Sequence, residues 1–290
     1  MKLRLAFLFA LAFASTAQAL LWIVPSRFAA AVGGSYDSEA QAYFDAIVSN
    51  GGTISTASKG YVNTFILAAK SHGYWSKIKH INLFAGDQLS AALVAIKPGV
   101  GTSVDTNHNF VGGDYTESGG LVGNGSTKYL DTGMLASSLS ANDTHIAQYN
   151  KTNETSSTSA IGAAYLADSV FSCHFPYSGT LYSDQYNSGG SAGRVSTGCV
   201  SAGLHIGTRT SSSAHVIYVA GSSVASSSTS GGTLSTIAYN CFVFCRNDAG
   251  TPNYFFNAAM IGYSFGSGLS STDASNFSTD WAALQGALGR

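Results

Sequence analysis

The sequence of 290 residues predicts a mainly β protein, in which a jelly-roll sandwich lies between a small N-terminal helical region and a C-terminal helix. Apolar residues recur every three or four positions before residue 98, whereas after residue 99 short runs alternate between apolar and polar residues. Glycine, serine and asparagine separate these runs, as they do in turns between short strands. Apolar residues make up 45% of the chain and charged residues only 10%, which is ample material for a core.

Residues 1–19 have the pattern of a secretory signal peptide. Lys2 and Arg4 precede an apolar run, and the small–x–small sequence at 17–19 resembles a cleavage site. This run is too short to span a bilayer, and no later segment spans one, so no membrane span is expected after the signal is removed. An uncleaved apolar tail that packs within an assembly is the alternative, because residues 20–24 are also apolar. Residues 20–36 are predicted to be a linker.

Residues 37–98 are predicted to form a helical lead-in. Two helical patterns come first, and glycines at 51 and 52 end the first of them. Trp75, Ile78 and Ile81 indicate a further turn or short helix, and the apolar stripe at 89–96 is compatible with either a helix or a strand. These apolar stripes need a surface to bury against, so the lead-in is expected to pack on the rest of the chain. The helix faces consist of Ala40, Tyr43, Phe44, Ile47 and Val48, and of Val62, Phe65, Ile66 and Ala69.

Residues 99–290 are predicted to form the jelly-roll sandwich with its C-terminal helix. In the strand predicted at 143–149, Thr144, Ile146 and Gln148 point to one face, because strand side chains alternate. The serine-rich segment 222–232 is interpreted as a turn or hairpin tip, and a helix is expected near 280–288. The further strands are predicted at 160–166, 170–175, 198–207, 215–220, 240–246 and 258–265.

The glycine-punctuated segment 123–133, Gly-Asn-Gly-Ser-Thr-Lys-Tyr-Leu-Asp-Thr-Gly, resembles the strand-turn segment of laminin-G-like, concanavalin A-like lectin-fold domains. The likeness is greatest to such domains of phage virion and tail proteins and of related bacterial secreted proteins. Segments 109–115, 206–213 and 244–250 also resemble parts of these domains. The resemblance implies a concanavalin A-like jelly roll. It implies no reaction, because lectins, adhesins, glucanases and structural virion parts share this fold.

The expected function is that of a non-catalytic surface recognition or adhesion module that binds carbohydrate, on a secreted extracellular protein or on a phage virion. A structural virion protein without glycan binding is the alternative, and its partners would be other virion or surface subunits. A divergent glycoside hydrolase is the third hypothesis. Such an enzyme needs two carboxyl groups roughly 5 to 9 Å apart, and no predicted strand carries a Glu-x-Asp-x-Glu pattern, so no catalytic residue is predicted. The formal net charge of −1 provides no basic field for nucleic acid.

Segment 176–194 is the predicted recognition loop. Aromatic rings match the apolar faces of sugars, and neighbouring amides and carboxylates match their hydroxyl groups. The alternative is a surface loop whose tyrosines cover the edge of the sandwich. The expected partner is a glycan or a cell-surface polysaccharide. The candidate ligand-binding residues are Tyr177, Tyr182, Asp184, Gln185, Tyr186 and Asn187.

No organic cofactor is predicted, and calcium is the one metal for which the sequence offers candidates. Asp131, Asn247 and Asp248 lie in or near predicted turns and carry the oxygen ligands that calcium prefers. Each is also an ordinary turn residue. Cys241 and Cys245 are four residues apart, about 13 Å along a straight strand, which is too far for a disulfide. Cys173 and Cys199 remain open either to bridge or to stay reduced.

Overall fold

The computed structural model describes residues 35–152, 158–165, 169–177, 179–188, 193–198, 202–230 and 237–290. For residues 169, 170, 172–177 and 188 only the backbone is described. The predicted signal peptide and nearly all of the predicted linker lie outside these ranges. In the described part of the chain, no helix combines the length and the apolar character that crossing a membrane requires.

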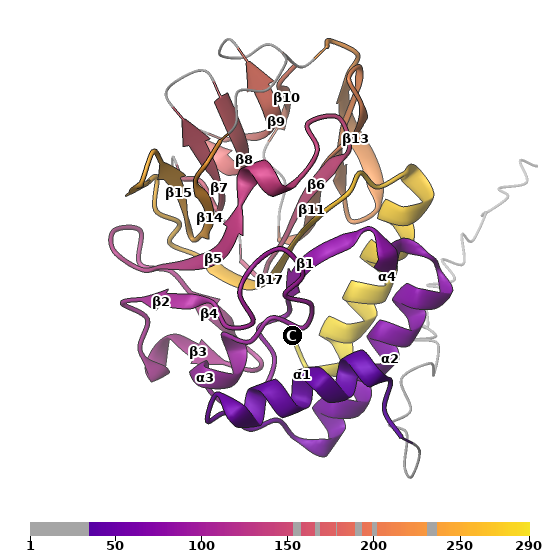
Figure 1. The fold of residues 1–290 in the computed structure, drawn as a ribbon, viewed down its shortest axis with the longest axis vertical. Coiled ribbons are helices and arrows are strands. Elements are labelled where there is room, and N and C mark those ends of the chain that lie inside the picture. The colour runs from indigo at the N-terminus through magenta and orange to yellow at the C-terminus, as the bar shows by residue number, and fades with distance from the viewer. Residues whose placement is uncertain are drawn as a thin grey trace, which may run out of the picture.

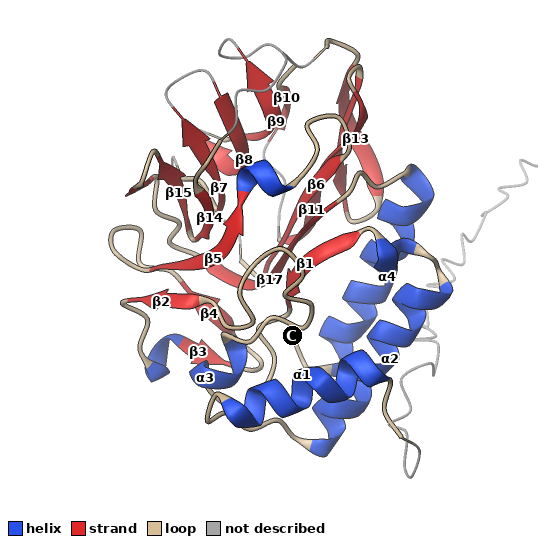
Figure 2. Cartoon of the chain, in the orientation of Figure 1, coloured by secondary structure: helices blue, strands red, loops and turns tan. Residues whose placement is uncertain are grey.

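The described chain forms three layers, which are a layer of helices and two stacked β-sheets (Figures 1 and 2). The sheet next to the helices, called the helix-side sheet below, has the strand order β13-β12-β11-β6-β17-β4-β3, and β1 pairs with β17. The predicted mainly β sandwich with a C-terminal helix is confirmed. The strands of this sheet are β1 (Ile78–Asn82), β3 (Tyr115–Thr116), β4 (Gly120–Val122), β6 (Thr144–Asn150), β11 (Gly203–Ser211), β12 (Ala214–Val219), β13 (Ser222–Ser227) and β17 (Ala259–Gly266).

The second sheet, called the outer sheet below, covers the other side of the sandwich. Its strand order is β10-β9-β8-β7-β14-β5-β2, and β15 joins it through parallel pairing with β7. Its strands are β2 (Thr106–His108), β5 (Tyr129–Leu135), β7 (Ile161–Tyr165), β8 (Ser169–Tyr177), β9 (Thr180–Ser188), β10 (Val195–Gly198), β14 (Asn240–Val243), β15 (Cys245–Asp248) and β16 (Thr251–Asn253).

Strand β6 separates the two cores of the molecule. Ile146 belongs to the apolar core between the two sheets, and Ala147 belongs to the core between the helix-side sheet and the helices. This difference follows from the alternation of side chains along a strand. Both faces of β6 are therefore covered, as expected of a central strand.

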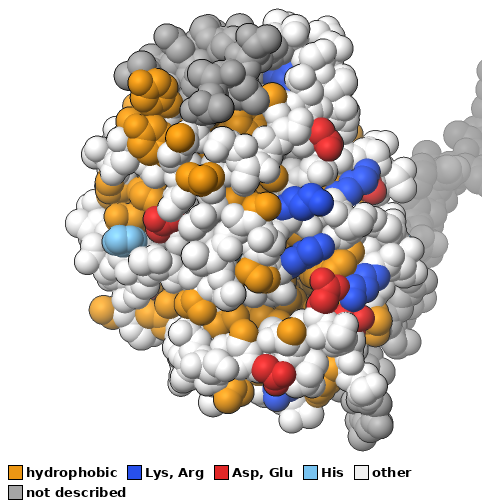
Figure 3. Space-filling view, in the orientation of Figure 1, with side chains coloured by type: hydrophobic (Ala, Val, Ile, Leu, Met, Phe, Trp, Pro, Cys, Tyr) orange, Lys and Arg blue, Asp and Glu red, His pale blue; other side chains and the backbone are white. Residues whose placement is uncertain are grey.

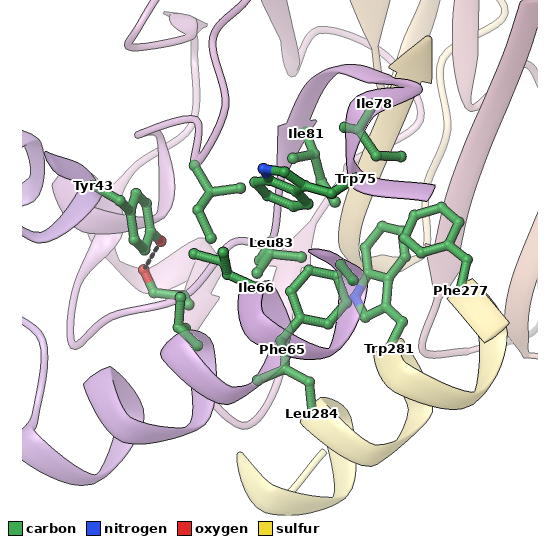
Figure 4. Packing of buried hydrophobic residues seen from close by; sticks show 14 of the residues in the cluster. Tyr43, Phe65, Ile66, Trp75, Ile78, Ile81, Leu83, Phe277, Trp281 and Leu284 are labelled. Atoms are coloured by element: carbon green, nitrogen blue, oxygen red, sulfur yellow. Dashed lines mark hydrogen bonds between the residues drawn. The ribbon is translucent and has the colours of Figure 1, made fainter. Parts of the chain in front are cut away.

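The helical layer is made from both ends of the described chain. Helix α2 (Thr56–Ser71) packs against both α1 (Ser38–Ser49) and α4 (Ser271–Ala287), and the short α3 (Leu89–Ala92) follows β1. Trp281 lies at the centre of this layer, with its ring centroid 5.0 Å from that of Phe277 and 6.4 Å from that of Phe65 (Figure 4). Residues 37–98 therefore share one core with the C-terminal helix and the helix-side sheet.

Three of the predicted elements differ in the structure. The turn or short helix expected from Ile78 and Ile81 is strand β1, which is antiparallel to β17. Segment 222–232 begins with strand β13 and is not simply a turn, because β13 pairs along β12. The C-terminal helix begins at Ser271, where Ser270 and Asp273 form a capping box, so it is about two turns longer than predicted.

Part of the space between the sheets is polar. Gln148 and Asn150 are fully buried on the inner face of β6. None of their four side-chain amide atoms has a hydrogen-bond partner in the part of the chain that the structure describes. An unpaired buried polar group costs roughly 1–3 kcal/mol. The unpaired amides of Gln148 and Asn150 therefore lower the stability of the folded protein.

Replacement of Gln148 by methionine is expected to raise the free energy of unfolding by about 1–2 kcal/mol. Methionine has a similar volume and removes two unpaired polar atoms from the interior. Urea unfolding of the two proteins measures this change. The matched control is Gln41→Met on the exposed face of α1, where a change below about 0.5 kcal/mol is expected. A loss of stability in the Gln148 variant would contradict the prediction.

Candidate functional site

The predicted recognition loop is a β-hairpin. The described residues within 176–194 comprise the end of β8, the whole of β9 and two residues before β10, so the prediction of a long loop is wrong. Gly179 has a φ of 76° and forms the tight turn between β8 and β9. Tyr177 lies at the end of β8, where only the backbone is described. The polar residues that suggest a loop belong to a strand whose inner face is also polar.

Three of the candidate residues lie in the interior. The Gln185 Nε2 donates to the carbonyl of Gly207 in the opposite sheet at 2.9 Å. The Tyr186 hydroxyl donates to the carbonyl of Ala136, and Tyr186 has a φ of 56° that interrupts the alternation of β9. Asn187 is also buried, at 1% exposure. These three side chains therefore hold the sandwich together and do not line an open surface.

The other two candidates, Tyr182 and Asp184, form a cluster with Arg194. The guanidinium of Arg194 donates from Nε and Nη2 to the two carboxylate oxygens of Asp184, both at 2.8 Å. The same guanidinium lies over the Tyr182 ring, 5.0 Å from its centroid. Asp184 is fully covered, whereas the side chain of Arg194 is 30% exposed. Tyr182 and Asp184 alternate with the core residue Leu181, which directs them to the outer face of the outer sheet.

A second cluster repeats this arrangement at β15 and the segment after β16. Arg246 makes a two-point ion pair with Asp248, and its Nη2–Oδ2 distance is 2.9 Å. The Arg246 guanidinium lies 4.6 Å from the ring centroid of Tyr254. Asn253 also donates from Nδ2 to Asp248, at 3.2 Å. We refer to the two clusters, Tyr182–Arg194–Asp184 and Tyr254–Arg246–Asp248, as the Tyr–Arg–Asp triads.

The charges of the two triads influence one another. Burial raises the pKa of the Asp184 carboxyl, whereas the hydrogen bonds and charge of Arg194, the bond from Asn187 and the charge of Arg246 lower it. The ion pair with Asp184 raises the pKa of Arg194. The triads therefore lie within electrostatic reach of each other, and each presents a fixed donor–acceptor pair beside an aromatic ring.

A row of aromatic rings crosses the outer sheet near its β2 edge. The ring of His108 stacks on that of Tyr129, with centroids 4.1 Å apart and an angle of 3° between the planes. Tyr129 also lies 4.8 Å from Phe242 and 6.2 Å from Phe255, again between ring centroids. Figure 3 shows hydrophobic side chains gathered over this side of the molecule, whereas the charged side chains gather beside the helices. The aromatic row extends the apolar character of the outer sheet.

The calcium candidates already have protein partners. Asp131 accepts hydrogen bonds from the Gly133 backbone at 2.8 Å and from the Asn240 amide at 3.1 Å. The Asn247 Oδ1 accepts from the Gly250 backbone at 2.8 Å, and Asp248 is paired with Arg246. Within the described ranges, no three or more His, Cys, Asp or Glu side chains are grouped so that they could hold a metal ion.

The straight strand expected through Cys241 and Cys245 is broken. Phe244 has a φ of 68°, which ends β14 and starts β15. Both cysteines are buried and free. The side chains of Cys173 and Cys199 are outside the described part of the chain.

Sequence reasoning missed Arg194, Arg246 and Tyr254 as possible site residues. The Arg-x-Asp spacing at 246–248 was a usable signal, because residues two apart on a strand point to the same side. Nothing comparable links Asp184 to Arg194, which are ten residues apart and meet only because β9 and β10 pair.

No protein-family model matches the sequence, and no curated protein sequence matches it. Among solved structures, the chain is similar to a mutant of Trypanosoma rangeli sialidase that displays trans-sialidase activity, with 10% identity and a TM-score of 0.48 over 78% of this chain and 39% of that one. It is similar to domain 4 of an extracellular GH43 arabinanase from Geobacillus stearothermophilus, solved with arabinotriose, with 15% identity and a TM-score of 0.46 over 70% and 98% of the two chains.

A third similar structure is a mutant of the NanB sialidase of Streptococcus pneumoniae, with 16% identity and a TM-score of 0.37 over 54% of this chain and 27% of that one. The chain thus spans about a quarter of the length of that sialidase. The β-sandwich of this protein is established by the order and register of its own two sheets.

Proposed function

We propose that this protein is a non-catalytic carbohydrate-recognition module and that the two Tyr–Arg–Asp triads form its sugar-binding surface. The observation that carries the proposal is the repeated arrangement, in which an Arg–Asp ion pair is stacked on a tyrosine ring. A sugar ring offers an apolar CH face to an aromatic ring. Its neighbouring hydroxyl groups both donate and accept hydrogen bonds, which matches a fixed guanidinium beside a carboxylate.

The ion pairs favour binding over catalysis. A glycosidase needs one carboxyl group that donates a proton and a second that acts as nucleophile or base. In the triads, each carboxylate is held in two-point contact by an arginine, which favours its ionised form and occupies its oxygens. Asp184 and Asp248 therefore hold the arginines in place beside the tyrosine rings, and the partly exposed guanidinium of Arg194 is suited to donate hydrogen bonds to sugar hydroxyls.

The proposed setting is the surface of a secreted protein or of a phage virion. The signal-peptide pattern of residues 1–19 supports secretion, and the resemblance of segment 123–133 supports a virion or cell-surface role. The low proportion of charged residues, 10% of the chain, suits neutral polysaccharides better than highly charged partners.

A glycan-array screen of the purified chain, with calcium and with chelator, tests the proposal. Specific binding is expected, and Tyr182→Ala or Tyr254→Ala is expected to weaken it at least about tenfold, because loss of a central aromatic contact costs roughly 2 kcal/mol. Tyr165→Ala is the matched control, since Tyr165 is 42% exposed and belongs to neither triad.

A blank array would overturn the proposal and favour a purely structural role. Binding that both triad variants retain would place the sugar site elsewhere. Release of reducing sugar from a bound polysaccharide would contradict the non-catalytic assignment. Binding lost only in chelator would direct attention to Asp131, Asn247 and Asp248.

A further inference from the structure

A buried arginine lies between the two sheets. Arg209 on β11 is fully buried, although its residue type normally stays at the surface. Its Nη1 donates to the carbonyl of Ser212 at 2.7 Å. Its Nη2 contacts the Asn187 Oδ1 at 3.2 Å and the carbonyl of Gly193 at 3.3 Å. Its Nε has no hydrogen-bond partner among the residues that the structure describes.

This guanidinium has no counter-charge among the described residues. Its acceptors in the described part of the chain are neutral carbonyl groups, and burial lowers the pKa of Arg209. A guanidinium does not lose its proton to escape burial. An unpaired buried charge is expensive, typically several kcal/mol. A bound anion would offset this cost.

His215 does not balance the charge, because it is neutral. Its Nδ1 lies 2.8 Å from the carbonyl of Gly193 and must donate, and its Nε2 lies 3.0 Å from the Ser183 hydroxyl, from which it accepts. Burial, opposed by the hydrogen bond to the Gly193 carbonyl and assisted by the charge of Arg209, lowers the pKa of His215 to about 4. The 3.4 Å approach of the Arg209 Nη2 to Nδ1 thus brings two donors together.

Asp184 does not supply the counter-charge either. Its carboxylate is held by the two-point ion pair with Arg194. Asn187 connects the Arg194–Asp184 ion pair with Arg209, because its Nδ2 donates to Asp184 at 2.6 Å and its Oδ1 faces Arg209. Among the described residues, the connected group of Arg194, Asp184 and Arg209 therefore has two positive charges and one negative charge beneath the first triad.

We propose that Arg209 is a binding site for a small oxyanion, which the free Nε–H of its guanidinium would hold inside the sandwich. The planar guanidinium matches the oxygen spacing of phosphate, sulfate and carboxylate groups. An anion at this position would neutralise the buried charge and accept a hydrogen bond from the Arg209 Nε. It would also favour the protonated form of His215.

Thermal unfolding of the full chain at pH 7 tests this site, with sodium phosphate varied at constant ionic strength in sodium chloride. We expect the Tm to rise by roughly 3–5 °C for each tenfold increase in phosphate above the dissociation constant. Arg209→Met should abolish the rise. Lys79→Met, which removes an exposed charge, should retain it. Parallel series with sulfate and acetate distinguish a tetrahedral oxyanion from a carboxylate.

The wild-type protein provides a second measurement that does not depend on whether the Arg209 variant folds. Phosphate should raise the pKa of His215, followed through its imidazole resonances by NMR. No change in either the Tm or the His215 resonances with any of the three anions would overturn the proposal. An equal rise in Tm for wild type and Arg209→Met would also overturn it, because the anion would then act elsewhere.

Discussion

Replacement of Trp281 by alanine is expected to lower the free energy of unfolding by about 3–5 kcal/mol, the range for deletion of a fully buried aromatic side chain. Trp281 is 0% exposed, and its ring lies 5.0 Å from Phe277, 6.4 Å from Phe65 and 5.8 Å from Tyr149 between centroids. These partners come from α4, α2 and β6. The substitution therefore opens a cavity where both helical segments meet the helix-side sheet.

Denaturant unfolding followed by far-ultraviolet circular dichroism and by fluorescence measures this effect. Both signals should move together, because the helices and the sandwich share one core. Leu67→Ala on α2 is the matched control, since Leu67 is 49% exposed and should change stability by less than about 0.5 kcal/mol. Separate transitions for the helices and the sheets would show that residues 37–98 form an independent lead-in and contradict the shared core.

The strands with regular alternation were predictable from the sequence. In β6, Ile146 and Ala147 face different cores, and in β17 both Tyr263 and Phe265 lie in the core between the sheets, so local pattern and tertiary environment agree there. A register shift between Met260 and Gly262 interrupts the alternation at the start of β17. Strand β1 shows why other elements were not predictable from the sequence. Ile78 and Ile81 are three residues apart, as on a helix, while the polar His80 and Asn82 are fully buried. Their environment comes from β17, about 180 residues later in the chain.

The candidate site was only partly predictable for the same reason. The residues of β9 have the composition of a loop, because the groups that satisfy its inner side chains lie in the opposite sheet. Ser183 contacts His215, Gln185 bonds to Gly207, and Asn187 faces Arg209. A sequence shows the polar residue but not its distant partner. Composition therefore identified Tyr182 and Asp184 as candidate site residues, but it did not separate them from their buried neighbours.

Acidification from pH 7 to pH 4 is expected to reduce the free energy of unfolding by about 5 kcal/mol. Burial lowers the pKa of His80, His145 and His215 to about 4, compared with about 6.5 in an unfolded chain. Between these values the unfolded state binds more protons, so stability falls as the pH falls, by roughly 3 kcal/mol for each histidine. Asp105 has the opposite effect. Burial raises the pKa of its carboxyl to about 7, so below that pH the folded state binds the extra proton and gains about 4 kcal/mol.

The three histidines together change the free energy of unfolding more than Asp105 does, so the net effect of acidification is a loss of stability. Two substitutions separate these opposing contributions. The His145 Nδ1 lies 2.6 Å from the Ser267 carbonyl, and His145→Gln keeps a polar group near that carbonyl. Because glutamine does not titrate, the slope of stability against pH between 6.5 and 4 should become shallower in this variant. Asp105→Asn removes the carboxyl group that takes up a proton in the folded state, so this variant should have a steeper slope. The asparagine amide oxygen can still accept the hydrogen bond from the Tyr263 hydroxyl, which lies 2.7 Å from the Asp105 Oδ1. Urea unfolding at pH 7, 6, 5 and 4 measures all three slopes. A wild-type stability that is flat or rises toward pH 4 would show that these histidines become protonated in the folded protein, and that the burial of neutral imidazoles does not control its acid stability.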